Sequence, residues 1–113
     1  MKDYKKLFFL YLLLILLVSS IPGNSFPKSW FSLGFQDKIY HLIEYSILGV
    51  LGYLAYSKTA GYKIIIFCII FGIFDELYQG LIPGRFPNAF DAIADGLGVI
   101  LGYSIIRLIK KND

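Results

Sequence analysis

Charged and polar side chains recur within strongly apolar stretches of this 113-residue chain, where they are least expected. In the hydrocarbon of a membrane a charged side chain costs at least about 2.5–3.5 kcal/mol, so such residues face one another or water and usually serve a function. Carboxylates grouped with a histidine can carry out general acid–base catalysis, conduct protons or hold a hard cation. The residues concerned are Asp37, Lys38, His41, Glu44, Asp75, Glu76, Gln79, Arg85, Asp91 and Asp95.

Most of these residues fall on three helical stripes, because side chains three or four positions apart share one face of a helix. The third stripe continues into two glycines four residues apart, a step that permits close packing of helices. The stripes consist of Asp37 with His41 and Glu44, of Asp75 or Glu76 with Gln79, and of Asp91 with Asp95, Gly98 and Gly102.

The composition indicates that a membrane surrounds these stripes. Apolar residues make up 57% of the chain and charged residues only 17%, whereas a soluble domain carries about 25% charged residues. An aromatic content of 18% excludes disorder, and a single cysteine excludes an internal disulfide. Four stretches approach the length of about 20 residues that crosses a bilayer. We therefore predict one all-α, polytopic domain over residues 1–113, with four transmembrane helices over about 7–21, 39–56, 62–82 and 89–109.

The first apolar run has a second interpretation. Lys2, Lys5 and Lys6 followed by a 12-residue apolar run resemble a cleavable signal peptide. The run ends in Val18-Ser19-Ser20-Ile21-Pro22, which has no clear small-x-small cleavage site. We therefore expect this segment to remain in the protein as its first helix.

The distribution of lysine and arginine predicts the orientation of the spans. Eight of the eleven basic residues lie in the N-terminal segment, the link between the second and third spans, and the C-terminal segment. The other two links hold Lys28, Lys38 and Arg85. We therefore predict a multi-pass protein of the cell membrane with both termini cytoplasmic. Basic residues facing anionic lipid account for the net charge of +3, so no nucleic-acid partner is expected.

The depth of the polar residues within their predicted spans places them in one layer of the membrane. Glu44, Asp75 and Asp95 lie six or seven residues from the outer ends of their predicted spans, which is roughly 9–10 Å below the outer surface. The sequence therefore predicts one polar pocket that opens to the extracytoplasmic side. Six acids against two permanent cations leave four negative charges in excess, so some carboxyls hold protons or a cation is bound. The predicted mouth consists of Asp37, Lys38, Gln79, Arg85 and Asp91.

The ordered motifs resemble those of the VanZ-like family, small membrane proteins named for a component linked to teicoplanin resistance. The likeness covers nearly the whole chain and includes the Ser19-Ser20-Ile21-Pro22 exit of the first helix. It implies a location in the cell envelope and lower susceptibility to glycopeptides such as teicoplanin. The family often has Asn where Asp95 stands, which implies that Asp95 works in its protonated form. The motifs are Asp37-Lys38-x-x-His41, Asp75-Glu76-Leu77-Tyr78-Gln79, Pro83-Gly84-Arg85 and Asp91-x-x-x-Asp95-x-x-Gly98.

Two functional hypotheses follow. In the first, the protein is an intramembrane hydrolase or transferase that acts on an envelope lipid or a lipid-linked wall precursor. Glu76 or Asp75 is then the general base, His41 its acid–base partner and Arg85 an anion clamp. The predicted catalytic set is Asp37, His41, Asp75 and Glu76, and the predicted substrate-binding set is Lys38, Glu44, Gln79, Arg85, Asp91 and Asp95.

The alternative is a non-catalytic membrane module whose polar pocket binds a ligand or partner. A proton transporter is disfavoured, because no ionisable residues continue from the pocket into the cytoplasmic half. No cofactor and no metal are predicted, since no cysteine or second histidine completes a ligand shell around His41. The sequence leaves the substrate and the oligomeric state open.

Overall fold

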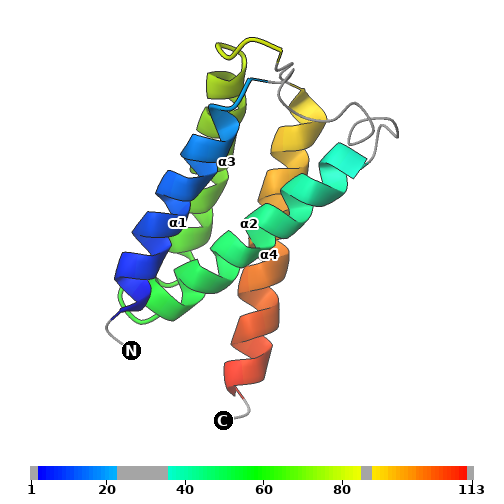
Figure 1. The fold of residues 1–113 in the computed structure, drawn as a ribbon. Coiled ribbons are helices and arrows are strands. Elements are labelled where there is room, and N and C mark those ends of the chain that lie inside the picture. The colour runs from blue at the N-terminus through cyan, green and yellow to red at the C-terminus, as the bar shows by residue number, and fades with distance from the viewer. Residues whose placement is uncertain (1–2, 23–35, 85–87, 112–113) are drawn as a thin grey trace.

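The computed structural model describes residues 3–22, 36–84 and 88–111, and these residues form four α-helices and no strand (Figure 1). This all-α architecture agrees with the class predicted from the sequence. The helices begin and end within a few residues of the predicted spans. They are α1 (Tyr4–Ser19), α2 (Gln36–Tyr56), α3 (Lys63–Gln79) and α4 (Ala89–Lys111).

Local sequence explains where the helices start and stop. The turn between α2 and α3 contains Gly61 with a φ of 58°, a left-handed conformation that glycine adopts without steric cost. Helix α3 ends earlier than predicted, because Gly80 caps it and Pro83 and Gly84 follow. At the start of α4, the Asn88 side-chain oxygen accepts a 2.8 Å hydrogen bond from the Phe90 amide, as an N-cap residue does.

The helices form an elongated bundle of 44 × 23 × 20 Å. Helices α1 and α3 run in one direction, and α2 and α4 run in the other (Figure 1). Both chain ends and the turn between α2 and α3 therefore lie at one end of the bundle. The ends of α1 and α3 and the starts of α2 and α4 lie at the opposite end, which we call the distal end.

Glycines allow α2 and α4 to approach each other closely. A Cβ atom added at Gly98 would lie 2.5 Å from the Leu42 carbonyl oxygen. One added at Gly102 would overlap the Ser46 carbonyl, and one at Gly49 would overlap the Val99 carbonyl. The two backbones thus touch directly, as they do in small-xxx-small helix pairs. This contact fixes the register between α2 and α4.

The apolar core fills the half of the bundle nearest the chain ends. Phe8 of α1, Leu48 of α2 and Val99 of α4 are each at most 1% exposed there. Cys68 of α3 is buried in the same core, with its sulfur 3.7 Å from the position of a Cβ on Gly52. Hydrophobic packing therefore holds this half together, whereas the distal half contains the buried acids.

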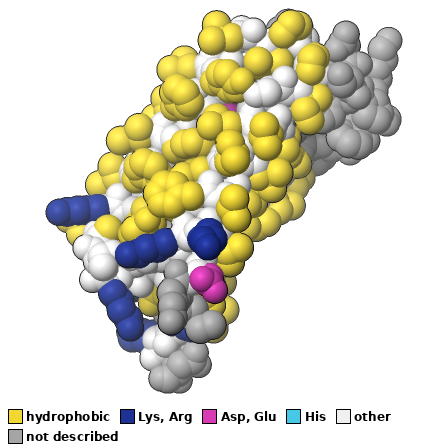
Figure 2. Space-filling model, turned by 60° about the vertical axis from the view of Figure 1, so that its left-hand side comes forward, with side chains coloured by type: hydrophobic (Ala, Val, Ile, Leu, Met, Phe, Trp, Pro, Cys, Tyr) yellow, Lys and Arg dark blue, Asp and Glu magenta, His cyan; other side chains and the backbone are white. Residues whose placement is uncertain are grey.

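The outer faces of the helices are apolar. Leu13, Ile43 and Phe74 are each more than half exposed, and hydrophobic side chains cover the body of the molecule in Figure 2. Lysines and arginines gather at the end that holds the chain ends (Figure 2). One described helix, α4, is both long and apolar enough to cross a membrane. Helices α1 and α3 have 16 and 17 residues, about 24–26 Å of helix, less than the roughly 30 Å hydrocarbon core.

The α2–α4 contact predicts different outcomes for two glycine-to-alanine changes in α4. Gly102→Ala should lower the free energy of unfolding by about 1–3 kcal/mol, because the new methyl group forces the backbones apart. Gly96→Ala is the matched control, since its Cβ would meet only Ile69 side-chain atoms at 3.8 Å or more. Thermal unfolding in detergent, followed by circular dichroism, measures both. Equal midpoints for the two variants would contradict the packing described.

Candidate functional site

Three helices contribute acids and a histidine to one buried group near the distal end, which we call the acid–histidine cluster. Helix α2 provides His41, α3 provides Asp75 and Glu76, and α4 provides Asp91 and Asp95. None of these residues is more than 5% exposed. The structure thus brings together most of the predicted site, although its members come from separate helices.

Near the distal end, the α2–α4 interface pairs basic side chains of α2 with acids of α4. His41 Nδ1 lies 2.7 Å from Asp95 Oδ1, and His41 Nε2 lies 3.8 Å from Asp91 Oδ2. Above this layer Lys38 Nζ lies 2.9 Å from Asp91 Oδ1, with the lysine side chain 31% exposed. The imidazole therefore lies between two carboxylates. These carboxylates fix its orientation, as hydrogen-bond partners do for a catalytic or metal-ligating histidine.

The two acids of α3 have different partners. Tyr45 of α2 donates its hydroxyl to Asp75 Oδ2 at 2.9 Å. Glu76 Oε2 accepts the backbone N–H of Asn88 at 2.7 Å, so this carboxylate lies at the positive N-terminal end of α4. Within the described part of the chain, Glu76 Oε1 and Asp95 Oδ2 are buried and accept no hydrogen bond.

Gln79 lies on the α1 side of α3 and joins the ends of these two helices. Its amide Nε2 donates to Ser19 Oγ at 3.2 Å. Beside it, the hydroxyls of Ser20 and Tyr78 share a 2.6 Å hydrogen bond. Gln79 thus has a packing partner in α1, and the serines in the exit of the first helix have a structural use.

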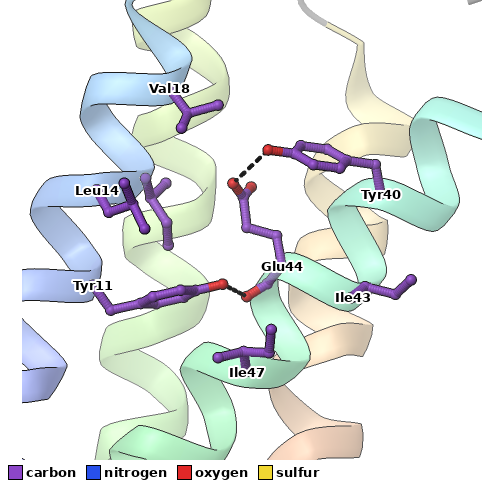
Figure 3. Close-up of a pocket in the computed structure, with 8 residues that line it drawn as sticks. Tyr11, Leu14, Val18, Tyr40, Ile43, Glu44 and Ile47 are labelled. Atoms are coloured by element: carbon purple, nitrogen blue, oxygen red, sulfur yellow. Dashed lines mark hydrogen bonds between the residues drawn. The ribbon is translucent and has the colours of Figure 1, made fainter. Parts of the chain in front are cut away.

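Glu44 lies apart from the acid–histidine cluster. It is half-buried on the α1-facing side of α2, in a groove of about 210 Å³ that Figure 3 shows. Tyr40 donates to its carboxylate at 3.3 Å, and Tyr11 of α1 donates to its backbone carbonyl at 2.7 Å. The remaining lining is aliphatic, and consists of Leu14, Ile15, Val18, Ile43 and Ile47.

Two predicted site residues cannot be placed. Arg85 lies outside the described residues, and so does the side chain of Asp37. Of the predicted mouth residues whose side chains are described, Lys38 alone is partly exposed. The predicted open mouth therefore has support from this residue only. The four acids of the acid–histidine cluster form a closed group rather than the walls of an open pocket.

The sequence analysis missed three contributors to this region. Tyr45, fully buried beside Asp75, follows His41 by four residues, and this spacing could have identified it. Gly72 leaves the space into which Asp95 fits, since a Cβ there would lie 3.0 Å from Asp95 Cβ. Asn88 acts through its backbone amide, and a side-chain motif gives no sign of such a role.

The apolar helix faces, the span-length α4 and the buried acid–histidine cluster are the features of a helical membrane protein. The VanZ/LLP1 family model matches residues 8–110, so the chain belongs to this family. No curated protein and no solved structure shows a significant match to the chain.

The Tyr45–Asp75 contact predicts a specific loss of stability. Tyr45→Phe removes the donor and leaves a buried carboxylate oxygen without that bond, so the free energy of unfolding should fall by about 1–3 kcal/mol. Tyr62→Phe is the control, because Tyr62 is 70% exposed. Unfolding of both variants in mixed detergent provides the comparison. A free energy of unfolding that is unchanged in Tyr45→Phe would show that Asp75 does not depend on this hydroxyl.

Proposed function

We propose that this VanZ-family protein is a four-span protein of the cell membrane that binds or processes an envelope lipid or a lipid-linked wall precursor at the outer leaflet. Such an activity would lower susceptibility to glycopeptides such as teicoplanin. The observation that carries the proposal is the acid–histidine cluster, buried where three helices meet near the distal end. Buried acids in a membrane protein are costly, and they are usually retained for function.

The orientation in this proposal is supported by the basic residues. Those at the end that holds the chain ends are all exposed, as expected for residues that stay in the cytoplasm. With this orientation the acid–histidine cluster faces the outer leaflet. The 44 Å length of the bundle is close to the full thickness of a bilayer with its headgroups. The basic residues concerned are Lys5, Lys6, Lys58, Lys63, Arg107, Lys110 and Lys111.

The groove between α1 and α2 supports a lipidic substrate. Its aliphatic lining suits an acyl or isoprenoid chain, and its rim residues Leu14 and Ile43 are 50% and 56% exposed on the outer surface of the bundle. Glu44 and Tyr40 place polar atoms at one side of the groove, where a headgroup would lie (Figure 3). A lipid could therefore enter sideways from the bilayer.

An acid–base mechanism is supported by the arrangement of His41 and Glu76. Asp95 holds the imidazole in one orientation, as carboxylates do for catalytic histidines. Glu76 keeps one buried oxygen without a hydrogen bond in the described part, which suits a general base. Arg85, which no structural observation covers, remains the proposed anion clamp.

The second candidate is a non-catalytic binding module, and the closed state of the cluster favours it. Lys38 pairs with Asp91, and His41 pairs with Asp95, so much of the buried charge is already balanced within the protein. In this case the polar residues would hold the helices in register while a ligand binds at the groove. The two candidates differ in whether the envelope changes chemically.

The four-span topology can be tested by cysteine labelling in a Cys68→Ser background. Leu81, 79% exposed beyond the end of α3, should become reactive to a membrane-impermeant maleimide from outside when changed to cysteine. Thr59→Cys, in the turn between α2 and α3, should react only after the cells are opened. The reverse pattern would place the acid–histidine cluster on the cytoplasmic side.

The chemical role can be tested by comparing lipids, wall precursors and teicoplanin susceptibility in cells that express the native chain or Glu76→Gln. We expect Glu76→Gln to insert normally and to reduce any lipid or precursor conversion at least about 100-fold, because a general base is removed. Asp3→Asn, an acid-to-amide change in the exposed N-terminal segment, is the matched control and should behave as the native chain.

Two results would decide between the candidates. If Glu76→Gln and Asp75→Asn both leave the native envelope profile and susceptibility intact, the acid–base assignment is wrong. If the native chain lowers susceptibility while lipids and precursors stay chemically unchanged, the binding module is correct.

A further inference from the structure

We propose that His41, Glu76 and Asp95 form a binding site for a divalent transition-metal ion, Zn²⁺ or Mn²⁺. Each of these residues offers one ligand atom, and the three atoms lie within 4.8 Å of one another. Nitrogen and oxygen ligands about 2.0–2.2 Å from an ion lie roughly 3–4 Å apart around it. Side-chain shifts of about 1 Å would therefore close the three donors on one ion.

Two buried oxygens point to a missing partner at this place. Glu76 Oε1 and Asp95 Oδ2 accept no hydrogen bond in the described part of the chain, and their residues are 5% and 0% exposed. A buried polar atom without a partner destabilises the fold, and more so when it carries charge. Both oxygens belong to residues of the proposed ligand set, and each is an acceptor that a cation can satisfy.

Charge also favours an ion. Among the described residues, four buried carboxylates face Lys38 and His41, which carry at most two positive charges. Because a ligating imidazole is neutral, a divalent ion together with Lys38 would offset three of these four negative charges within the low-dielectric interior. The carboxylates are Asp75, Glu76, Asp91 and Asp95.

The donor set selects the kind of metal. One imidazole and two carboxylates suit Zn²⁺ or Mn²⁺, whereas a thiolate site would need cysteine, and Cys68 lies in the apolar core away from the cluster. Three protein ligands leave at least one position for water or a substrate oxygen. In the sequence no cysteine or second histidine completes a ligand shell around His41, but the packing of α3 and α4 on α2 brings two carboxylates to it.

Metal binding would compete with the hydrogen bond that now joins the donors. His41 Nδ1 and Asp95 Oδ1 are 2.7 Å apart and share a proton. Imidazole ligates in its neutral form, so an ion that enters between these atoms displaces that proton. The site would thus exchange one internal hydrogen bond for bonds to the ion.

The test uses the full chain purified in detergent with a tag that contains neither histidine nor cysteine. After treatment with a chelator, ZnCl₂ or MnCl₂ is titrated by calorimetry, and bound metal is counted by mass spectrometry. We expect one ion per chain, and at least about a tenfold weaker affinity in His41→Gln, Glu76→Gln and Asp95→Asn. Glu44→Gln and Cys68→Ser are the matched controls and should bind as the native chain does.

A second measurement uses only the native protein, so it does not depend on whether a variant folds. X-ray absorption of the Zn²⁺-loaded native protein should show one imidazole, oxygen neighbours and no sulfur. Absence of stoichiometric metal, sulfur in the ligand shell, or affinity unchanged in all three ligand variants would overturn the proposal. Binding is measured without any envelope substrate, so this outcome is independent of the function proposed above.

Discussion

The direct contact between the backbones of α2 and α4 determines where the buried polar side chains of these two helices lie. Gly98 and Gly102 bring α4 against the carbonyl groups of Leu42 and Ser46, with no side chain between the helices. One turn closer to the distal end, the same short separation places His41 within 2.7 Å of Asp95. A larger residue at either glycine would separate the helices and leave His41 and Asp95 buried without their hydrogen bond, which is destabilising.

The bundle has two halves that differ in the side chains that fill the interior. Near the chain ends, aromatic and aliphatic side chains such as Phe8 and Val99 fill the interior, and packing alone holds the helices. Near the distal end, acids replace the apolar core, and α2, α3 and α4 contribute to the acid–histidine cluster. The boundary lies at Tyr45, whose ring belongs to the apolar core and whose hydroxyl binds Asp75.

Much of this arrangement could be predicted from the sequence, because helical spacing and span length depend on local residue order. The four helices, and the grouping of polar residues from α2, α3 and α4 in one region, follow from periodicity and depth. The direction of individual side chains could not be predicted in the same way. Glu44 shares a helix stripe with His41, yet it faces α1, since the position of α1 around α2 depends on packing. Closure of the cluster likewise depends on Gly72 and on the Asn88 backbone amide. Neither contributes a polar side chain to the site, so a motif of polar residues could not reveal them.

The described site depends on the contact between His41 and Asp95 across the α2–α4 interface. A double-mutant cycle measures it directly, with the free energy of unfolding in mixed detergent determined for the native chain, His41→Gln, Asp95→Asn and the double variant. The structure predicts a coupling energy of at least about 1 kcal/mol, as found for residues that share one buried network. Effects that add to within about 0.5 kcal/mol would show that the two side chains do not meet in the folded protein, and would contradict the site described.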